Sequence, residues 1–273
     1  MRNRIIIPFF FIVFMGFQSQ SIAQFTPEEL AEREKWEEFL KTAEIVGSED
    51  IPEGVTKPIR LFLKKGEVKG SGAWKKVKGV QKGFLDGWRY EIAAYGMDKL
   101  LGLNMVPPTV EREFRGKQGS LQFWMKFEMS DLERMERNIK IPPSKLYNWS
   151  KMKYLMRAFD SLIANEDRTQ ENIRYTKGWR MILIDHSRSF RSSKKFTKNL
   201  VYGKNGIKER KLFRILPRAF VKKTKALNFD NIKKAVGSYL KEKEIKAILA
   251  RKELLLIEID EMIKEKGEDK VLY

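Results

Sequence analysis

Three oxygen-bearing side chains, Asp167, Asn172 and Asp185, lie close together in the sequence at a spacing that suits phosphoryl-transfer chemistry. Such oxygens are the ligands of Mg²⁺, a hard cation that takes one or two carboxylates and keeps several waters. A further carboxylate beside the metal accepts or orients the proton of an attacking hydroxyl. Each residue alone is an ordinary turn or strand-end residue. The prediction therefore depends on all three together.

Two short apolar runs predict the β-hairpin that would position these residues. Residues 173–175 and 180–184 are separated by a turn-like Thr-Lys-Gly-Trp stretch, a pattern typical of paired strands. Folding this hairpin brings Asn172 and Asp185 together, with Asp167 across from them. The amphipathic stretch 152–163 before the site predicts a helix.

A lysine and a glutamate in the upstream half complete the set that phosphoryl transfer requires. Lys75 closes a strand-like run that follows an apolar strand at 61–63, and it has the small-apolar-Lys form of a phosphate-pairing strand. Glu91 opens the run 91–101, whose apolar residues recur at helical spacing and which stops at Gly102. We expect this helix-borne carboxylate to pair with Lys75. The plainer alternative is that Lys75 is one solvated lysine among many.

The order of these motifs resembles the atypical kinases that group phosphatidylinositol 3/4-kinase-like proteins with the secretory-pathway Golgi casein kinases, and more distantly the HipA-type kinases. The resemblance spans residues 51–190 and is carried by segments 91–95, 101–103, 106–110, 119–122, 165–172 and 183–186. It implies an α+β, two-lobed protein-kinase-like fold. A small β-rich N-lobe would carry one key helix, and a larger C-lobe would be mainly helical.

The resemblance also implies an activity, the transfer of a phosphoryl group from ATP with Mg²⁺ or Mn²⁺, and a role for each residue. The implied roles are phosphate contact for Lys75, pairing with that lysine or metal binding for Glu91, catalysis for Asp167, metal binding for Asn172 and Asp185, and a border to the adenine for Gln122 and Trp124 within segment 122–125.

The sequence departs from conventional protein kinases around the site. His186 and Ser187 follow the metal aspartate in place of Phe-Gly, and no His-Arg pair precedes Asp167. No strict phosphate-cradling glycine loop is present. The candidates for its backbone N–H groups are Gly54 before the first strand, or Gly70 and Gly72 before Lys75.

Three neighbours of the site have plainer interpretations than direct chemistry. We expect His186 to pack behind Asp185, because the chain has no cysteine and no second histidine to complete a zinc site. Glu166 is expected to cap its loop, with assistance to the metal as the alternative. Arg168 is expected to pack or pair beside Asp167, and its alternative is contact with a phosphate.

The amino terminus has the three-part pattern of a secretory signal. Basic Arg2 and Arg4 precede an apolar run at 5–17, and small residues end at Ala23. The run is short for a membrane span. We therefore expect export, to a periplasm or beyond the cell, after cleavage near Ala23. The alternative is an uncleaved anchor with the rest of the chain outside the cytoplasm, which is the only membrane contact we expect.

The predicted organisation is a signal peptide at 1–23, an N-terminal helix and linker at 24–50, a kinase-like N-lobe at 51–128 and a kinase-like C-lobe at 129–273. Thr26 and Pro27 mark the start of the N-terminal helix, and residues 47–50 are the linker. Residues 129–141 are expected to be helical. Further helices are predicted after 216, over 228–240 and from about 241 onward.

The formal charge of +19 predicts an acidic partner. Basic residues crowd the segment 188–214, directly after Asp185, where an acceptor would lie. We therefore expect the acceptor hydroxyl to belong to an acidic protein, a lipid headgroup or a glycan. Two alternatives stay open: a catalytically inactive kinase-fold binding protein, and a basic protein that binds nucleic acid or another polyanion, although no nucleic-acid-binding module is recognisable.

Overall fold

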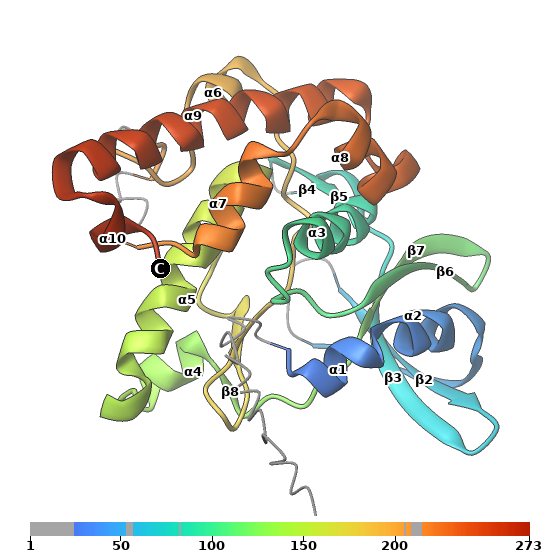
Figure 1. Cartoon of the computed structure of the whole chain (residues 1–273). Coiled ribbons are helices and arrows are strands. Elements are labelled where there is room, and N and C mark those ends of the chain that lie inside the picture. The colour runs from blue at the N-terminus through green and yellow to red at the C-terminus, as the bar shows by residue number, and fades with distance from the viewer. Residues whose placement is uncertain (1–24, 53–56, 82, 205, 209–214) are drawn as a thin grey trace, which may run out of the picture.

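The fold is that of a computed structural model, which describes residues 25–52, 57–81, 83–204, 206–208 and 215–273. The predicted signal peptide at 1–23 and the candidate glycine Gly54 lie outside the described residues. The chain has a two-lobed, kinase-like α+β fold, as the resemblance implied. In Figure 1 the sheet of the small lobe lies on one side of helix α3, and most of the helices lie on the other.

The small lobe is built on a five-stranded antiparallel sheet in the order β1-β2-β3-β7-β6. Gly66, with a positive φ of 60°, forms the tight turn between the second and third strands. Lys75 ends the third strand as predicted. The strands are β1 (Glu44–Asp50), β2 (Ile59–Lys65), β3 (Val68–Lys75), β6 (Thr109–Phe114) and β7 (Lys117–Phe123).

Two helices precede this sheet, α1 (Pro27–Ala31) and α2 (Arg33–Thr42). The predicted cap is present, because the Thr26 hydroxyl accepts the backbone N–H of Glu29 while the Glu29 carboxylate accepts that of Thr26. Helix α2 buries Phe39 and Leu40 in the core of the small lobe, together with residues of the sheet. It therefore braces this lobe.

The predicted linker at residues 47–50 was wrong, because these residues belong to β1 and pair with β2. The segment looks like a linker in sequence because β1 is an edge strand whose residues are largely solvated, and polar side chains suit such an edge. Arg60 on the neighbouring strand pairs with Glu49 across the two strands at 3.1 Å. The sheet therefore begins several residues before the predicted lobe boundary.

Helix α3 (Trp88–Leu101) follows a two-stranded hairpin, β4 (Lys78–Gln81) and β5 (Phe84–Gly87). It ends at Gly102 in the left-handed conformation, as predicted. The helix contacts β6 and β7 on one side and helices α7 and α8 on the other. It therefore links the two lobes, as Figure 1 shows.

The large lobe combines a three-stranded sheet in the order β10-β9-β8 with helices. The prediction of a helix over 129–141 was wrong at both ends, because Met129 and Ser130 pair with β9 and the helix stops at Glu136. Its elements are β8 (Met129–Ser130), α4 (Asp131–Glu136), α5 (Pro143–Ile163), β9 (Ile173–Tyr175), β10 (Met181–Leu183), α6 (Lys194–Lys198), α7 (Arg218–Lys225), α8 (Phe229–Val236), α9 (Glu242–Lys266) and α10 (Glu268–Val271).

The carboxy-terminal helices lie close to the predicted positions. A short 3₁₀ turn, η1 (Gly237–Tyr239), follows α8 and completes the predicted 228–240 segment. Helix α9 contacts α5, α6, α7 and α8, and its buried Ile245, Ile248, Leu255 and Ile259 belong to the main core. Within the described part of the chain, no helix combines the length and apolar character that crossing a membrane requires.

Candidate functional site

Lys75, Glu91 and Asp185 converge from three distant segments of the chain. The Lys75 ammonium lies 2.8 Å from Glu91 Oε1 and 2.9 Å from Asp185 Oδ1. Lys75 ends β3, Glu91 lies in the first turn of α3, and Asp185 follows β10. The predicted pairing of Lys75 with Glu91 is present. Lys75 is therefore not a solvated surface lysine.

The electrostatics of this cluster favour the charged forms of Lys75 and Glu91. Burial opposes protonation of Lys75, but the carboxylates of Asp185 and Glu91 outweigh it and raise the pKa of the ammonium. Burial likewise opposes ionisation of Glu91, and the nearby Lys75 reverses this and lowers the pKa of the carboxyl. The second oxygen of Glu91 accepts the backbone N–H of His186 at 2.9 Å. Both oxygens of this carboxylate are therefore occupied.

The predicted hairpin forms and brings Asn172 and Asp185 together. Strands β9 and β10 pair with Met181 opposite Tyr175, and the Ile184 N–H donates to the Asn172 carbonyl at 3.1 Å. Asp185 itself has a φ of 56°, a conformation that aspartate tolerates better than most residues. Its side chain is 30% exposed. The carboxylate can therefore accept a ligand beyond its contact with Lys75.

Asp167 lies beside these residues with its side chain 39% exposed. Its backbone N–H donates to Asn165 Oδ1, and its carbonyl accepts the Asn172 side-chain N–H at 3.3 Å. Burial raises the pKa of the Asp167 carboxyl, Arg188 opposes this shift, and Asp185 reinforces it. Asp167 is thus an accessible carboxylate next to a second one, which is the arrangement a proton acceptor near a metal needs.

The donor set of the site fits magnesium or manganese. Asp185, Asn172 and Asp167 offer carboxylate and amide oxygens, which hard cations prefer. The described residues contain no group of three or more His, Cys, Asp or Glu side chains that could hold a metal ion. Carboxylate and amide oxygens of this kind suit a cation that keeps waters and binds phosphate oxygens.

Arg168 is packed, as one form of the expectation had it, but its ion-pair partner is Asp160 and not Asp167. It is buried and donates two hydrogen bonds, each 3.0 Å, to the carboxylate of Asp160 on α5. It also donates to the backbone carbonyls of Asn172 at 3.1 Å and Ile184 at 2.7 Å. Arg168 therefore anchors the loop and the hairpin to α5. It is a positioning residue.

The other two neighbours also have structural contacts. His186 is fully buried, as expected for a packing role behind Asp185. Its Nε2 lies 2.8 Å from an Arg168 N–H donor, so Nε2 is the acceptor and the proton sits on Nδ1. Burial and the Arg168 charge lower the His186 pKa. Glu166 pairs with Arg191 at 2.9 Å.

The candidate glycines Gly70 and Gly72 lie inside β3, and Gly72 pairs with both β2 and β7. A Cβ at Gly70 would lie 2.9 Å from the Phe39 ring, and one at Gly72 would lie 2.6 Å from Leu121. These glycines therefore permit close packing inside the strand ladder, and their contact with phosphate stays a prediction.

Gln122 and Trp124, the predicted adenine border, lie at the end of β7 where the chain leaves the small lobe. The Gln122 amide donates to the Thr109 hydroxyl at 3.0 Å, and the Trp124 ring lies 4.5 Å from the Arg60 guanidinium carbon. Trp124 remains 38% exposed. Their contact with adenine stays a prediction.

Sequence reasoning missed Asp86 and the role of Arg188. Asp86, at the end of the β4–β5 hairpin, is buried and accepts hydrogen bonds from Ser187 Oγ at 2.7 Å and Arg188 Nε at 3.0 Å. Arg188 Nη1 also lies 3.1 Å from Asp167 Oδ2. One arginine thus bridges a buried carboxylate and the candidate catalytic one. Asp86 stands between glycines in a short hairpin, where sequence alone indicates only a turn residue.

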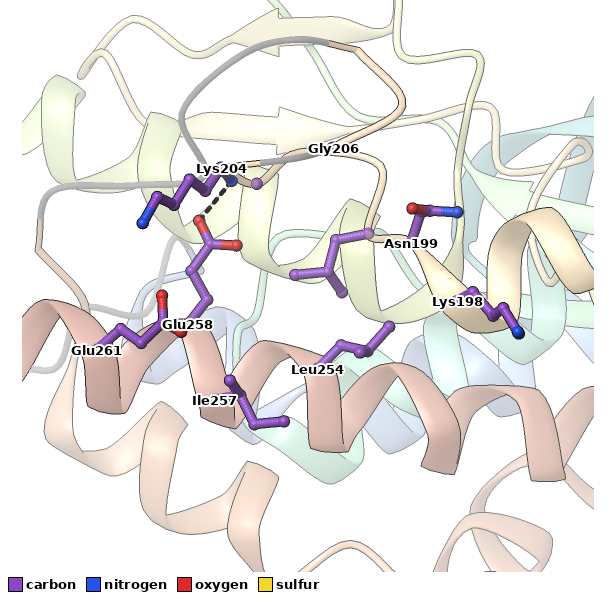
Figure 2. Close-up of a pocket in the computed structure, with 10 residues that line it drawn as sticks. Lys198, Asn199, Lys204, Gly206, Leu254, Ile257, Glu258 and Glu261 are labelled. Atoms are coloured by element: carbon purple, nitrogen blue, oxygen red, sulfur yellow. Dashed lines mark hydrogen bonds between the residues drawn. The ribbon is translucent and has the colours of Figure 1, made fainter.

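A separate hollow of about 190 Å³ lies between α9 and the segment formed by residues 198–204 and Gly206 (Figure 2). Its charges are mixed, and Glu258 accepts the backbone N–H of Lys204 at 2.9 Å. None of the residues that form the Lys75–Asp185 cluster lines it. This hollow is therefore not part of the candidate active site.

Comparisons with known proteins support the fold at the level of structure. No protein-family model matches the chain, and a search of curated proteins finds no match. The structure of hydra Fam20 with sugar matches with a TM-score of 0.62 and 15% identity, covering 93% of this chain and 95% of that chain. The Golgi casein kinase with Mn/ADP bound matches with a TM-score of 0.63 and 12% identity, covering 92% of this chain and 80% of that chain. The chain therefore has a Fam20-like atypical-kinase fold.

Proposed function

We propose that this chain is an atypical kinase that transfers the γ-phosphoryl group of ATP to a hydroxyl, with Mg²⁺ or Mn²⁺. The observation that carries the proposal is the convergence of Lys75, Glu91 and Asp185, at 2.8 and 2.9 Å, beside the accessible carboxylate of Asp167. Burying a lysine between two carboxylates costs desolvation free energy. Its placement at the edge of a metal-type donor set suits phosphate binding.

Each side chain has a distinct role in this proposal. Lys75 binds the phosphates of ATP, and Glu91 orients Lys75. Asp185 and Asn172 hold the divalent cation, whose chemistry when bound is to neutralise charge on the phosphates. Asp167 accepts or orients the proton of the acceptor hydroxyl. Segment 122–125 borders the adenine.

The acceptor in this proposal is acidic. Three exposed lysines, Lys194, Lys195 and Lys198, follow the catalytic cluster on α6, and the chain carries a formal charge of +19. Such a surface attracts an anionic acceptor through long-range electrostatics. Acidic proteins, lipid headgroups and anionic glycans all satisfy this requirement.

We also propose that the protein acts outside the cytoplasm. The support is the signal-like pattern of residues 1–23, with cleavage near Ala23 or retention as an anchor. We further propose that the lobe boundary lies between residues 128 and 129, and the support is that β7 ends at Phe123 and β8 begins at Met129. Cleavage near Ala23 would leave both lobes in the mature chain, and both lobes contribute residues to the site.

The second candidate is a kinase-fold protein that binds nucleotide without transferring phosphate. The observation that favours it is the contact of Arg188 with the Asp167 carboxylate at 3.1 Å. An arginine in this position competes with an acceptor hydroxyl for the same oxygen. Nucleotide binding without transfer to any acceptor would support this candidate.

The first test is metal-dependent ATP binding by the protein from Gln24 onward, measured as a thermal shift with and without Mg²⁺ or Mn²⁺. A ligand that binds only the folded state raises its stability. We expect a shift that needs both ATP and metal and that the Asp185→Asn variant loses. Asp260→Asn, the same change at an exposed position on α9, is the control and keeps the shift. A full shift in Asp185→Asn refutes the assigned site.

Transfer is then measured with γ-labelled ATP on an acidic protein, on anionic lipid vesicles and on an anionic glycan. Asp167→Asn is expected to bind ATP with metal but to lose transfer. Retention of full transfer in this variant contradicts the catalytic role of Asp167.

A further inference from the structure

A pocket of about 540 Å³ lies behind the catalytic cluster. Its walls are the β4–β5 hairpin, the start of α3, residues 190–193 and the start of α9. Among the candidate catalytic and metal-binding residues, none lines it. Asp86 lines the pocket and accepts a hydrogen bond from Arg188, which also contacts Asp167.

The lining of this pocket is strongly basic. Its acidic side chains are already satisfied: Asp86 pairs with Arg188 at 3.0 Å, and Glu244 accepts from Arg89 at 2.9 Å and from the Tyr90 hydroxyl at 2.7 Å. Among the described residues, no carboxylate pairs with the exposed lysines of the lining. The basic residues are Lys78, Arg89, Arg191, Lys241 and Lys243.

Arg191 supplies a buried donor without a partner. Its side chain is only 9% exposed. Nε donates to Glu166 at 2.9 Å and Nη1 donates to the Leu85 carbonyl at 2.7 Å. Nη2 has no hydrogen-bond partner among the described residues. An unsatisfied buried guanidinium N–H costs free energy, and the side chain that carries it lines the pocket.

The N-terminus of α3 faces the same pocket. Gly87, Trp88 and Arg89, its cap and first residues, all line the pocket, and no side chain caps this 14-residue helix. The N-terminal end of a helix carries a partial positive charge, although here the N–H groups of Gly87 and Trp88 already donate to the carbonyls of Ser187 and Val77 at 2.9 and 2.8 Å. The helix end, the buried guanidinium and the lysines therefore act on one volume.

We propose that this pocket binds a phosphate-type oxyanion, either inorganic phosphate or a phosphate monoester. Arg191 and Lys241 are the proposed direct ligands, with Lys78 and Lys243 adding charge. A guanidinium N–H gives a directional, charge-assisted hydrogen bond to such an oxygen. The pocket is distinct from the place proposed for the phosphates of ATP, which is at Lys75.

An anion here acts on the elements that carry the catalytic residues. Arg191 holds Glu166, the neighbour of Asp167, and α3 carries Glu91. An oxyanion shared by Arg191 and the α3 N-terminus ties these two elements together. This consequence rests on the proposed kinase function, whereas binding itself does not.

The test is a titration of the protein with inorganic phosphate and, separately, with O-phosphoserine, at constant ionic strength with chloride as the balancing ion. Binding is measured by calorimetry. We expect saturable binding of at least one of the two, and the arm that saturates identifies the source of the phosphate group. The Lys241→Gln/Lys243→Gln variant is expected to bind roughly tenfold more weakly.

The matched control is Lys264→Gln/Lys266→Gln, which removes the same charge from exposed positions at the other end of α9. This control is expected to bind as the unaltered protein does. Lys75→Met, in the candidate ATP site, is also expected to retain phosphate binding. Equal affinities for the two lysine-pair variants, loss of binding in Lys75→Met, or no saturation with either ligand would overturn the proposal. None of these outcomes depends on phosphotransfer. The proposed phosphate pocket can therefore be refuted without refuting the proposed kinase function, and the reverse also holds.

Discussion

The Glu91 carboxylate accepts the backbone N–H of His186 at 2.9 Å, so a single side chain on α3 holds the segment that carries Asp185. The other oxygen of Glu91 binds the Lys75 ammonium at 2.8 Å. Lys75 belongs to the small lobe and His186 to the large lobe. The closeness of Lys75 and Asp185 therefore depends on the position of α3, which makes this helix the element that assembles the site.

The Glu91→Gln variant is expected to lose activity and stability together. The change removes a buried charge next to the Lys75 ammonium and leaves an amide that cannot accept with both of its polar atoms. We expect about 2 kcal/mol less free energy of unfolding and at least a roughly hundredfold drop in phosphotransfer. Denaturant unfolding and a transfer assay measure the two effects.

The control for this change is Glu32→Gln, which breaks an exposed Glu–Lys pair on the surface of the small lobe. Exposed pairs of this kind contribute little to stability. Unchanged activity in Glu91→Gln would refute the role of Glu91 in orienting Lys75.

Much of the site could be predicted from the sequence because local signals carried it. The 173–184 hairpin has its own turn and apolar strands, and the end of α3 at Gly102 follows from a glycine at the helix end. Lys75 and Glu91 were paired by their element types and by the family resemblance. The local sequence of each of these elements is enough to specify it.

The remaining features depend on tertiary contacts that leave no local signal. Asp86 and Arg188 meet because the β4–β5 hairpin lies over the segment after Asp185. Arg168 points to Asp160 on α5 and away from its neighbour Asp167, since a buried arginine needs a buried carboxylate. The edge strand at 44–50 looks like a linker because most of its residues are exposed to water.

The Arg188→Gln variant is expected to shift the pH dependence of phosphotransfer. Burial raises the pKa of the Asp167 carboxyl and the Arg188 charge opposes this shift. Loss of that charge raises the Asp167 pKa further, so the acidic limb of the rate profile moves to higher pH. Initial rates across the pH range measure this. Lys194→Gln, a charge change nearby on α6, should leave the limb in place, and an unmoved limb in Arg188→Gln would contradict the contact's importance.

The Arg251→Met variant is expected to loosen the segment that follows the catalytic cluster. Arg251 on α9 is fully buried and donates to the carbonyls of Leu162, Arg191 and Phe196 at 2.8, 2.7 and 3.4 Å. Without it these carbonyls lose a donor, and we expect about 3 kcal/mol less stability. Denaturant unfolding measures this loss.

Two comparisons sharpen the Arg251 experiment. Arg251→Lys keeps the charge but has a single nitrogen for three acceptors, so an intermediate loss is expected. Lys246→Met, at an exposed position on the same helix, is expected to be neutral. A more stable Arg251→Met protein would show that the cost of burying the guanidinium outweighs its hydrogen bonds.

Asp98, near the end of α3, is expected to make stability depend on pH. Burial raises the pKa of this carboxyl to about 7, against the hydrogen bonds that its Oδ1 accepts from the backbone N–H groups of Met105 at 2.8 Å and Val106 at 3.2 Å. The folded state therefore binds a proton that the unfolded state releases near pH 4. The bound proton contributes its full amount to the free energy of unfolding below that pH. This contribution is lost as the pH rises toward 7, by at most about 1.4 kcal/mol per pH unit.

The Asp98→Asn variant tests this dependence because an amide oxygen can still accept both backbone N–H groups, while the side chain no longer titrates. Denaturant unfolding of both proteins at several values between pH 4 and 8 gives the difference in free energy. We expect the unaltered protein to lose stability relative to Asp98→Asn as the pH rises toward 7, and the difference to level off above it. A constant difference across this range would mean that Asp98 has the same protonation state in the folded and unfolded chains. The backbone turn after α3 would then be held by an ordinary ionised cap.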